Sequence, residues 1–299
     1  MSRVPIVGVD GGLSVDHLVR VGEAPHFFEL GGPGLFAALG ARLIRGTRVM
    51  LRTAMPSSVP AFSEVLTAAK VDLSLCGVAR DVPRVWILDS PEGRRLVLTR
   101  PPAGLEIAEV DEGLPAARST PKKKDFPQLD ALLLCSPLRL PSDVKDAAIV
   151  GIDPEQRKTK ANSLSYWKRI TIPQKSVLLP SRLQLVSVDD DPFRAALHLC
   201  EVLNVPVIAK LDADGALAVD KSGAWHVIDE QVQVVETTGA GDAMAGAALA
   251  AIASGYDIAT ATALGVSAAR LVLSDWGAGG LINSRPFSSP LRGVRTRRR

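Results

Sequence analysis

Cysteine and histidine are scarce in this sequence of 299 residues. The three cysteines, Cys76, Cys135 and Cys200, have neither the spacing of a zinc site nor that of a redox pair. Their neighbours are apolar, so we expect buried thiols in a reducing compartment. The four histidines form no HxxxH or HxH pair, which argues against a structural zinc site.

Long apolar runs and a strong charge bias are absent as well. No run is long enough to span a bilayer, and a strand is predicted near the N-terminus, without the apolar segment of a signal peptide. The formal net charge is +3, and the arginines near the C-terminus contribute part of it. These features predict a cytoplasmic protein that binds neither a membrane nor a nucleic acid.

Two common phosphate-binding motifs are also missing. The chain has no GxxxxGK(S/T) motif, and a GxGxxG fingerprint would need a glycine where Met244 stands. The composition, with 46% hydrophobic and 22% charged residues, is typical of a globular protein. The chain is long enough to bury a large core.

The most informative stretch is 232–254, VQVVETTGAGDAMAGAALAAIAS. Residues 232–235 predict the end of a strand, and residues 243–254 predict an alanine-rich helix. The turn between them, Gly239-Ala240-Gly241, places free N–H groups and the positive end of the helix dipole together, which makes an anion site.

An acid follows this turn directly. A carboxylate at Asp242 would repel a phosphate that simply rested on the turn. It makes more sense as a base that takes the proton from a substrate hydroxyl during attack on a γ-phosphoryl group. The alternative is a plain tight turn in which Asp242 caps the helix.

The stretch ETTGAGDAMAGAAL resembles the C-terminal signature of the ribokinase-like, or PfkB, carbohydrate kinase family, D-T-x-G-A-G-D-x-F/M. The resemblance implies that Asp242 is the catalytic base and that residues 239–241 form the anion hole. It also implies ATP and Mg²⁺ as cofactors, with Thr238 beside the nucleotide. Glu236 replaces the aspartate that helps to bind a monovalent cation in many relatives, so we expect an altered or absent dependence on K⁺.

The N-terminal part of the chain carries the expected acceptor site. Residues 4–9 predict a buried strand that leads into a loop, and Asp16 follows. The resemblance implies that Asp16 binds substrate hydroxyls, since a carboxylate accepts two hydrogen bonds. Without the resemblance, a turn residue is an equally good interpretation.

Gly31 and Gly32 precede a predicted helix over 35–43 and resemble the N-terminal di-glycine signature of the family, which lets a sugar lie against the backbone. Phe36 stands where most sugar kinases have a hydroxyl-binding asparagine. Phe36 either stacks on a sugar face or a base, or it faces the core. The substrate therefore need not be a plain hexose or ribose.

Two apolar runs, 85–88 and 95–99, flank a turn and predict a hairpin. The resemblance implies a small β lid with strands within 10–30 and 82–104, which is also the candidate surface for a homodimer. The arginines around the hairpin either meet an acidic or phosphorylated substrate or form a solvated edge. They are Arg84, Arg94, Arg95 and Arg100.

The middle of the chain alternates strands with other pieces. Residues 116–127 predict a polar linker, and the strands expected at 130–135, 149–153 and 177–180 predict a parallel sheet. After the third strand relatives carry N-x-x-E, which is associated with magnesium. This chain has a neutral Gln184 at the last position, a weaker partner for the magnesium shell.

The nucleotide site is expected from the next segments. Lys210-Leu211-Asp212 replaces the T-x-G of the family, and Gly215 supplies the nearby glycine. Lys210 either contacts the nucleotide phosphates or is a strand-end lysine in solvent. A second hairpin is expected at 216–228. Relatives close over the adenine at the loop 277–280, so Gly279 is a further candidate.

The sequence therefore predicts an α/β, ribokinase-like fold, with a mainly parallel central sheet flanked by helices and a small β lid. One kinase domain is expected over 1–287, with a disordered basic tail over 288–299. The predicted function is ATP-dependent transfer of the γ-phosphoryl group to a hydroxyl of a sugar or sugar-containing small molecule. Two alternatives remain: a nucleoside kinase of the same family, and a non-catalytic regulatory or binding protein that retains the fold.

Overall fold

The computed structural model describes residues 3–99, 108–110, 124–137, 139–154 and 163–299. A nine-stranded sheet forms its centre, and it is parallel from β4 through β13 and antiparallel beyond. In spatial order the strands are β16 (Val294–Arg298), β15 (Gly223–Asp229), β14 (Ala216–Asp220), β13 (Val207–Lys210), β12 (Ser176–Leu178), β11 (Ala147–Asp153), β10 (Leu129–Cys135), β1 (Ile6–Asp10) and β4 (Arg48–Arg52). The predicted mainly parallel sheet is confirmed.

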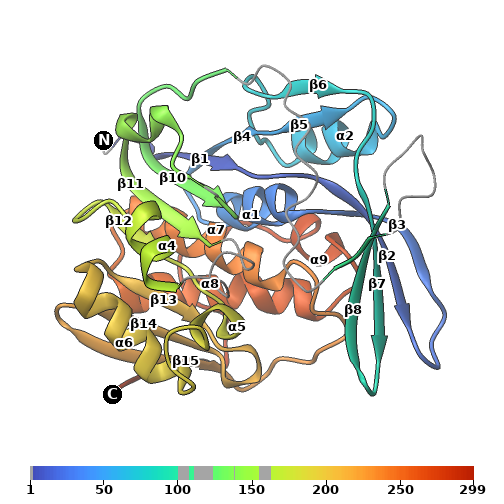
Figure 1. Ribbon diagram of the computed structural model, residues 1–299. Helices are drawn as coiled ribbons and strands as arrows, with labels where there is room; N and C mark the ends of the chain where they lie inside the picture. The colour runs from blue at the N-terminus through green and yellow to red at the C-terminus, as the bar shows by residue number, and fades with distance from the viewer. Residues whose placement is uncertain (1–2, 100–107, 111–123, 138, 155–162) are drawn as a thin grey trace.

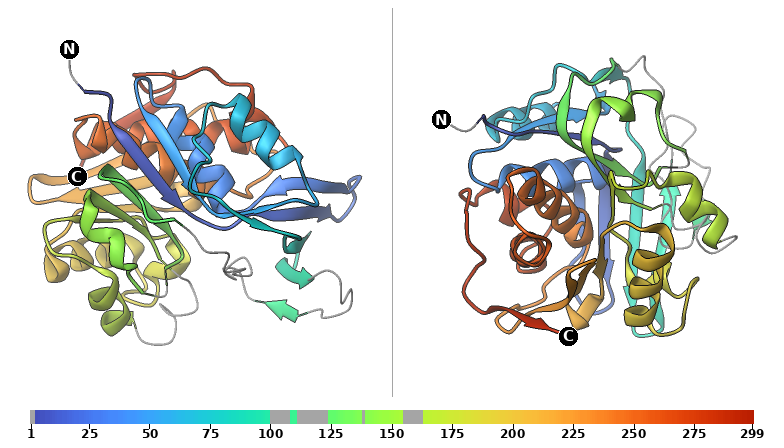
Figure 2. Two further views of the ribbon diagram at one scale, coloured as in Figure 1. Left: turned by 90° about the horizontal axis from the view of Figure 1, so that it is seen from above. Right: turned by 90° about the vertical axis from the view of Figure 1, so that its left-hand side faces the viewer.

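Helices cover both faces of this sheet, as the right-hand view of Figure 2 shows. The strands are apolar on both sides: Ala131 and Leu133 of β10 face one core, and Leu132 and Leu134 face the other. This double burial explains the continuous apolar runs of the sequence. The first core contains α1 (Pro33–Arg42), α2 (Ala61–Ala68), α7 (Ala240–Ala253), α8 (Ile258–Leu273) and α9 (Gly279–Ile282); the second contains α4 (Ser163–Ile170), α5 (Arg182–Leu185) and α6 (Pro192–Leu203).

Helices α1 and α7 cross in direct backbone contact. A Cβ atom on Gly246 of α7 would lie 2.0 Å from the carbonyl oxygen of Ala37, and one on Gly40 of α1 would lie 2.2 Å from the carbonyl oxygen of Ala243. The other residues of α7 at this crossing are mostly alanines, whose short side chains let the two helices lie close together. The crossing fixes the first turns of both helices relative to each other, and both turns belong to the site described below.

A second sheet projects from the carboxyl ends of the central strands and stands on the right in Figure 1. It contains the predicted hairpin, now β7 and β8, and its other strands lie at 14–20, 26–31 and 108–110. In spatial order they are β3 (His26–Gly31), β2 (Ser14–Arg20), β7 (Arg84–Ser90), β8 (Gly93–Thr99) and β9 (Ala108–Val110). We call this sheet the lid. A separate small sheet pairs β5 (Ala54–Pro56) with β6 (Gly77–Ala79).

The prediction of a disordered tail over 288–299 is wrong. Residues 294–298 form β16, an edge strand antiparallel to β15, with Thr296 opposite Val227. The Arg298 guanidinium also donates to the carbonyl of Ser222 over 3.0 Å. Four of the five side chains of β16 are exposed, so the composition resembles that of a free tail although the backbone is paired.

Three smaller expectations are also corrected. Residues 232–235 form no strand; instead Val235 N–H donates to the carbonyl of Leu273 at the end of α8, over 2.6 Å. The 277–280 segment is not all loop, because α9 begins at Gly279. The three cysteines are partly rather than fully buried. Residues 111–123, most of the predicted linker, lie outside the described part of the chain.

Candidate active site

A cavity of about 350 Å³ lies between the lid, the first turn of α1 and the first turn of α7. It brings together six of the residues that the sequence predicts for the site: Asp16, Gly32, Phe36, Thr238, Gly239 and Asp242. The other lining residues are Ser14, Pro33, Val85, Ile87, Arg94, Leu96, Ser181 and Thr237. Residues from the two ends of the chain therefore form one site.

The turn before α7 requires glycine at Gly239. Its φ of 82° lies in the left-handed region, and an added Cβ atom would lie 2.3 Å from the ring of Phe36. Helix α7 begins at Ala240, whose N–H donates to the Thr237 carbonyl over 3.3 Å. The N–H groups of Gly241 and Asp242 follow in the first turn, at the positive end of the helix, where an anion is favoured. Asp242 lies in this first turn, at the wall of the cavity.

Two carboxylates and one lysine share the space beside this turn. Lys210, at the end of β13, places Nζ 2.6 Å from Asp153 Oδ2 at the end of β11. An added Cβ atom on Gly241 would lie 3.6 Å from the same Nζ. Only 11% of the Lys210 side chain is exposed, so Lys210 belongs to the site and is not the solvent-facing lysine of the second interpretation. The sequence analysis missed Asp153.

These charges control the protonation of Asp242. Burial, and next the charge of Asp153, raises the pKa of Asp242 to about 7, and the charge of Lys210 opposes the shift. Burial also raises the pKa of Asp153, against the charge and the hydrogen bond of Lys210. An acid with a pKa near neutrality exchanges a proton readily at physiological pH, as a general base must.

Asp16 lies on β2, on the lid side of the cavity. An added Cβ atom on Gly31 would lie 2.0 Å from Asp16 Oδ2, so the carboxylate occupies the space that this glycine leaves. Ser14 Oγ donates to Asp16 Oδ1 over 2.7 Å. Burial raises the pKa of Asp16 to about 7, although the Ser14 hydrogen bond and the charge of Arg94 oppose the shift.

Phe36 faces the core and also reaches the wall of the cavity. Its side chain is only 1% exposed and packs under Gly239, yet it also lines the cavity. Val85, Ile87 and Leu96 of the lid add an apolar wall. The cavity is therefore polar at Asp16, Arg94 and Asp242 and apolar at Phe36 and these three lid side chains.

Comparisons with known proteins agree with this geometry at the family level. Residues 185–284 match the family model described as pfkB family carbohydrate kinase. Residues 185–284 therefore resemble that family. Among curated proteins none gives a significant match.

Solved structures extend the likeness to nearly the whole chain. Ribokinase from Cryptococcus neoformans var. grubii serotype A, in complex with ADP, is 19% identical with a TM-score of 0.66, over 93% of this chain and 96% of that one. Adenosine kinase from Sinorhizobium meliloti is 16% identical with a TM-score of 0.70, over 97% of each chain. Aminoimidazole riboside kinase from Salmonella enterica, complexed with aminoimidazole riboside and an ATP analog, is 19% identical with a TM-score of 0.66, over 94% and 97%. These likenesses show a ribokinase-like fold.

Nine of the predicted site residues do not line the cavity. Four of these nine make structural contacts elsewhere: Gln184, Asp212, Gly215 and Gly279. Gln184 is buried, and its amide accepts from Ser181 N–H and donates to the Pro154 carbonyl, each over 2.7 Å. Both ends of that amide therefore hold the backbone. Asp212 pairs with Arg182 over 3.3 Å.

The other two, Gly215 and Gly279, lie so close to neighbouring atoms that a side chain would not fit. An added Cβ atom on Gly215 would lie 2.3 Å from the Val227 carbonyl oxygen, and one on Gly279 would lie 2.7 Å from an Asp275 carboxylate oxygen. In the described part of the chain, no three His, Cys, Asp or Glu residues are grouped to hold a metal ion. Nor does that part include a helix whose length and hydropathy suit a membrane span.

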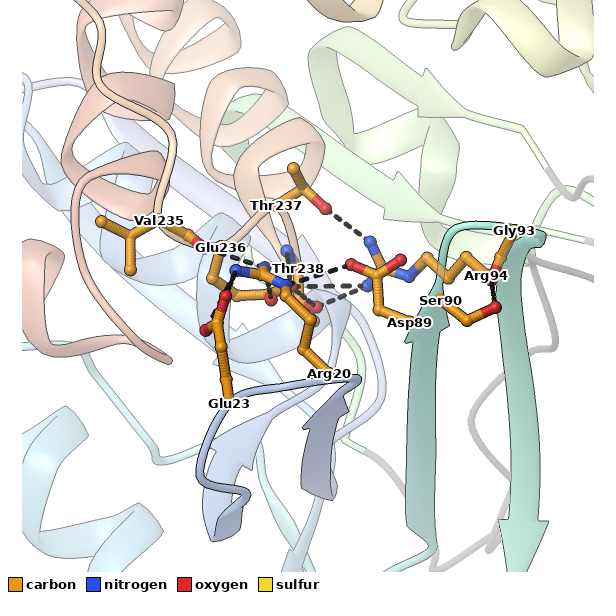
Figure 3. Close-up of polar contacts among 10 residues, drawn as sticks. All are labelled: Arg20, Glu23, Asp89, Ser90, Gly93, Arg94, Val235, Glu236, Thr237 and Thr238. Atoms are coloured by element: carbon orange, nitrogen blue, oxygen red, sulfur yellow. Dashed lines mark hydrogen bonds and ion pairs between the residues drawn. The ribbon is translucent and has the colours of Figure 1, made fainter.

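The opening acid of the PfkB signature lies next to two arginines of the lid (Figure 3). Glu236 accepts hydrogen bonds from the N–H and the hydroxyl of Thr238, over 2.9 and 2.6 Å. Arg94 donates to the hydroxyls of Thr237 and Thr238 over 2.5 Å each, and Arg20 donates to Glu236 over 3.2 Å. The sequence analysis named Arg94 only as one of several lid arginines and missed Arg20.

Proposed function

We propose that this chain is an ATP-dependent kinase that transfers the γ-phosphoryl group to a hydroxyl of a small molecule. The observation that carries the proposal is Asp242, a half-buried acid with a pKa raised to about 7, at the positive end of α7. In this role Asp242 takes the hydroxyl proton, and the N–H groups at the start of α7 stabilise the charge on the transferring group.

The acceptor and the nucleotide have separate partners in this proposal. Asp16 and Ser14 hold acceptor hydroxyls, and Lys210 offers its charge to the phosphates. Gln184 does not suit Mg²⁺ because both ends of its amide hold the backbone, whereas the Asp153 carboxylate would offer an oxygen ligand. Bound Mg²⁺ would neutralise charge on the β- and γ-phosphates.

The cavity favours an acceptor with an apolar or planar part. Phe36, Val85, Ile87 and Leu96 present carbon surface where a polyhydroxylated sugar needs hydrogen bonds. We therefore favour a sugar-containing acceptor such as a nucleoside over a plain hexose. The loss of a carboxylate at Gln184 favours a non-catalytic binding protein, as does the replacement of T-x-G by Lys210-Leu211-Asp212.

The outer face of the lid supports a homodimer. Phe27 and Phe28 are 47% and 65% exposed, and they contact the rings of His17 and Trp86. Exposed aromatic side chains gathered on one sheet face are typical of a protein interface. Light scattering on the wild type and on a Phe27→Ser, Phe28→Ser double variant tests this. The free thiols support a cytoplasmic location.

The activity test measures ADP release from ATP and Mg²⁺ with a panel of sugars, sugar phosphates and nucleosides. Turnover with one acceptor, reduced about 10²- to 10⁴-fold in Asp242→Asn, is the expected result. Asp190→Asn makes the same chemical change at an exposed loop position and should leave turnover unchanged. Nucleotide binding without turnover on any acceptor would favour the non-catalytic alternative.

A further inference from the structure

The carboxylate of Glu236 lies where the family resemblance implies a monovalent cation. Its side chain is 6% exposed, and Oε1 accepts both hydrogen bonds from Thr238. Although burial raises the pKa of Glu236, these bonds and the charge of Arg94 lower it overall, so the group is ionised near neutral pH. A buried anion of this kind needs a positive partner.

Arg20 supplies a positive charge at this carboxylate. It reaches from the lid strand β2 to the segment before α7, as Figure 3 shows. Its Nη2 lies 2.9 Å from the carbonyl oxygen of Val235 and 3.2 Å from Glu236 Oε2. One guanidinium nitrogen therefore contacts a backbone carbonyl and a carboxylate together.

The position of the Arg20 guanidinium is fixed from several sides. Nη1 donates to Glu23 over 3.2 Å, and Nε lies 3.4 Å from Asp89. The guanidinium carbon is 5.2 Å from the ring centre of Trp276, in the segment that follows α8. A planar cation with this many partners is held in one orientation.

The two oxygens that Arg20 contacts are of the kind that a bound hard cation uses, namely a carbonyl and a carboxylate. A second positive ion at the same oxygens does not fit, because the guanidinium already donates to both of them and its charge would repel the ion. Arg94 adds a further positive charge 3.7 Å from Glu236 Oε1. The expected K⁺ site is thus already occupied by the protein itself.

We propose that Arg20 acts as a resident cation in place of a bound monovalent ion, and that it positions the 235–238 segment and the anion turn after it. Arg20 is a positioning residue, since it acts on the site through Glu236. The glutamate suits this arrangement because it is one methylene longer than the aspartate of the family and reaches toward the lid. The inference rests on the proposed function for its nucleotide-binding readout, whereas the unfolding midpoint is independent of that function.

The first test compares the wild type in potassium chloride and in choline chloride at equal ionic strength. It measures the nucleotide Kd by calorimetry and the midpoint of thermal unfolding, and neither needs an acceptor. Both readouts therefore stay informative if no kinase activity is found. We expect the two salts to give the same Kd within about twofold and the same midpoint, because an ion that does not bind cannot stabilise the fold.

The second test removes the guanidinium with Arg20→Ala. In choline chloride we expect nucleotide binding to weaken about tenfold or more, since Glu236 loses the nearer of its two arginine partners and keeps only Arg94. Millimolar guanidinium ion should restore binding, and Arg20→Lys should retain part of it. Arg48→Ala is the matched control, because it removes an arginine from an exposed ion pair with Asp72 and should show neither the loss nor the rescue.

Two outcomes overturn the proposal. One is a wild type whose nucleotide affinity or unfolding midpoint rises with K⁺ but not with choline. The other is a folded Arg20→Ala variant that binds nucleotide as the wild type does and ignores guanidinium. If Arg20→Ala does not fold, the two-salt comparison and Arg20→Lys decide the matter.

Discussion

At the scale of single residues, Asp242 and Lys210 form an electrostatic pair whose effect on activity is measurable. The charge of Lys210 lowers the pKa of Asp242 and partly offsets the effects of burial and of Asp153. Removal of that charge therefore raises the pKa further. The base then needs a higher pH to be ionised.

Lys210→Met tests the direction of this change in the pKa of Asp242. We expect the acidic limb of the pH profile of kcat/KM, set near 7 in the wild type by Asp242, to move to higher pH by about one unit. Lys221→Met, in the exposed turn between β14 and β15, should leave the limb in place. A shift toward lower pH, or none at all, contradicts the assignment of Asp242 as the base.

The raised pKa of Asp242 also predicts a stability effect. Because the folded pKa is about 7 and the ordinary value is 3.8, the folded state holds more protons than the unfolded state between those values. Stability contributed by this group therefore falls as the pH rises through that window. Above pH 7, Asp242→Asn should raise the free energy of unfolding by about 1 kcal/mol, after allowance for Lys210 and solvent screening.

Urea unfolding of wild type and Asp242→Asn at several pH values measures this difference. It should be largest above pH 7 and vanish below the ordinary pKa of 3.8, where both states are protonated. Asp190→Asn again serves as the control. An Asp242→Asn variant less stable than the wild type at high pH would show that the carboxylate is stabilising where it lies.

The site residues that the sequence predicts are those inside local motifs. Asp242 follows the glycine turn, and Asp16 follows the first strand. Lys210 and Asp153 are 57 residues apart and meet only because β13 and β11 end at the same edge of the sheet. Arg20 and Glu236 are 216 residues apart and meet only through the lid. Contacts of this range leave no local pattern.

At the scale of elements, local signals explain where helices begin and where hairpins form. Asp191 caps α6 by accepting from Phe193 N–H, and Asp257 caps α8 by accepting from Thr260 N–H. The two predicted hairpins are confirmed as β7–β8 and β14–β15. The strand expected at 232–235 does not form, because Val235 N–H donates to the Leu273 carbonyl at the end of α8 and not to a neighbouring strand.

The crossing of α1 and α7 gives a prediction at this scale. Gly246→Ala gains about 1 kcal/mol of helix propensity, but its Cβ atom would lie 2.0 Å from the Ala37 carbonyl oxygen, and overpacking of this kind costs about 1–3 kcal/mol. We expect the cost of overpacking to exceed the gain in helix propensity, so that the unfolding midpoint falls by a few degrees. Turnover should fall as well, because both helices begin at the cavity.

Calorimetry on Gly246→Ala and on the reciprocal Gly40→Ala measures the outcome. Both changes push against backbone rather than against a flexible side chain, so both should destabilise. A higher midpoint in both variants would mean that the helices separate easily and that propensity decides. In that case the close crossing would not be what fixes the anion turn.

At the scale of the whole molecule, the fold class follows from the alternation of strands and helices together with the family signature. The order of the strands does not, because β1 lies between β4 and β10, which are distant in the sequence. The edge strand β16 was missed for a different reason. Its arginines have the composition of a solvated tail, whereas its pairing with β15 depends on backbone groups that all residues share.

Removal of residues 292–299 tests whether this strand belongs to the fold. The deletion takes away the backbone bonds to β15, each with a net contribution of about 0.5–1.5 kcal/mol, and the Arg298 bond to Ser222. We expect the unfolding midpoint to fall by several degrees, at about 2–4 °C per kcal/mol.

The deletion also removes five arginines and turns the net charge of +3 negative. A full-length variant with these arginines changed to glutamine separates the two effects, since it loses the charge and keeps the strand. If deletion and charge variant have the same midpoint as the wild type, residues 294–298 contribute nothing to stability and behave as a tail. If residues 294–298 form a paired strand, their amides exchange slowly in the wild type. In addition, the deletion alone then lowers the unfolding midpoint.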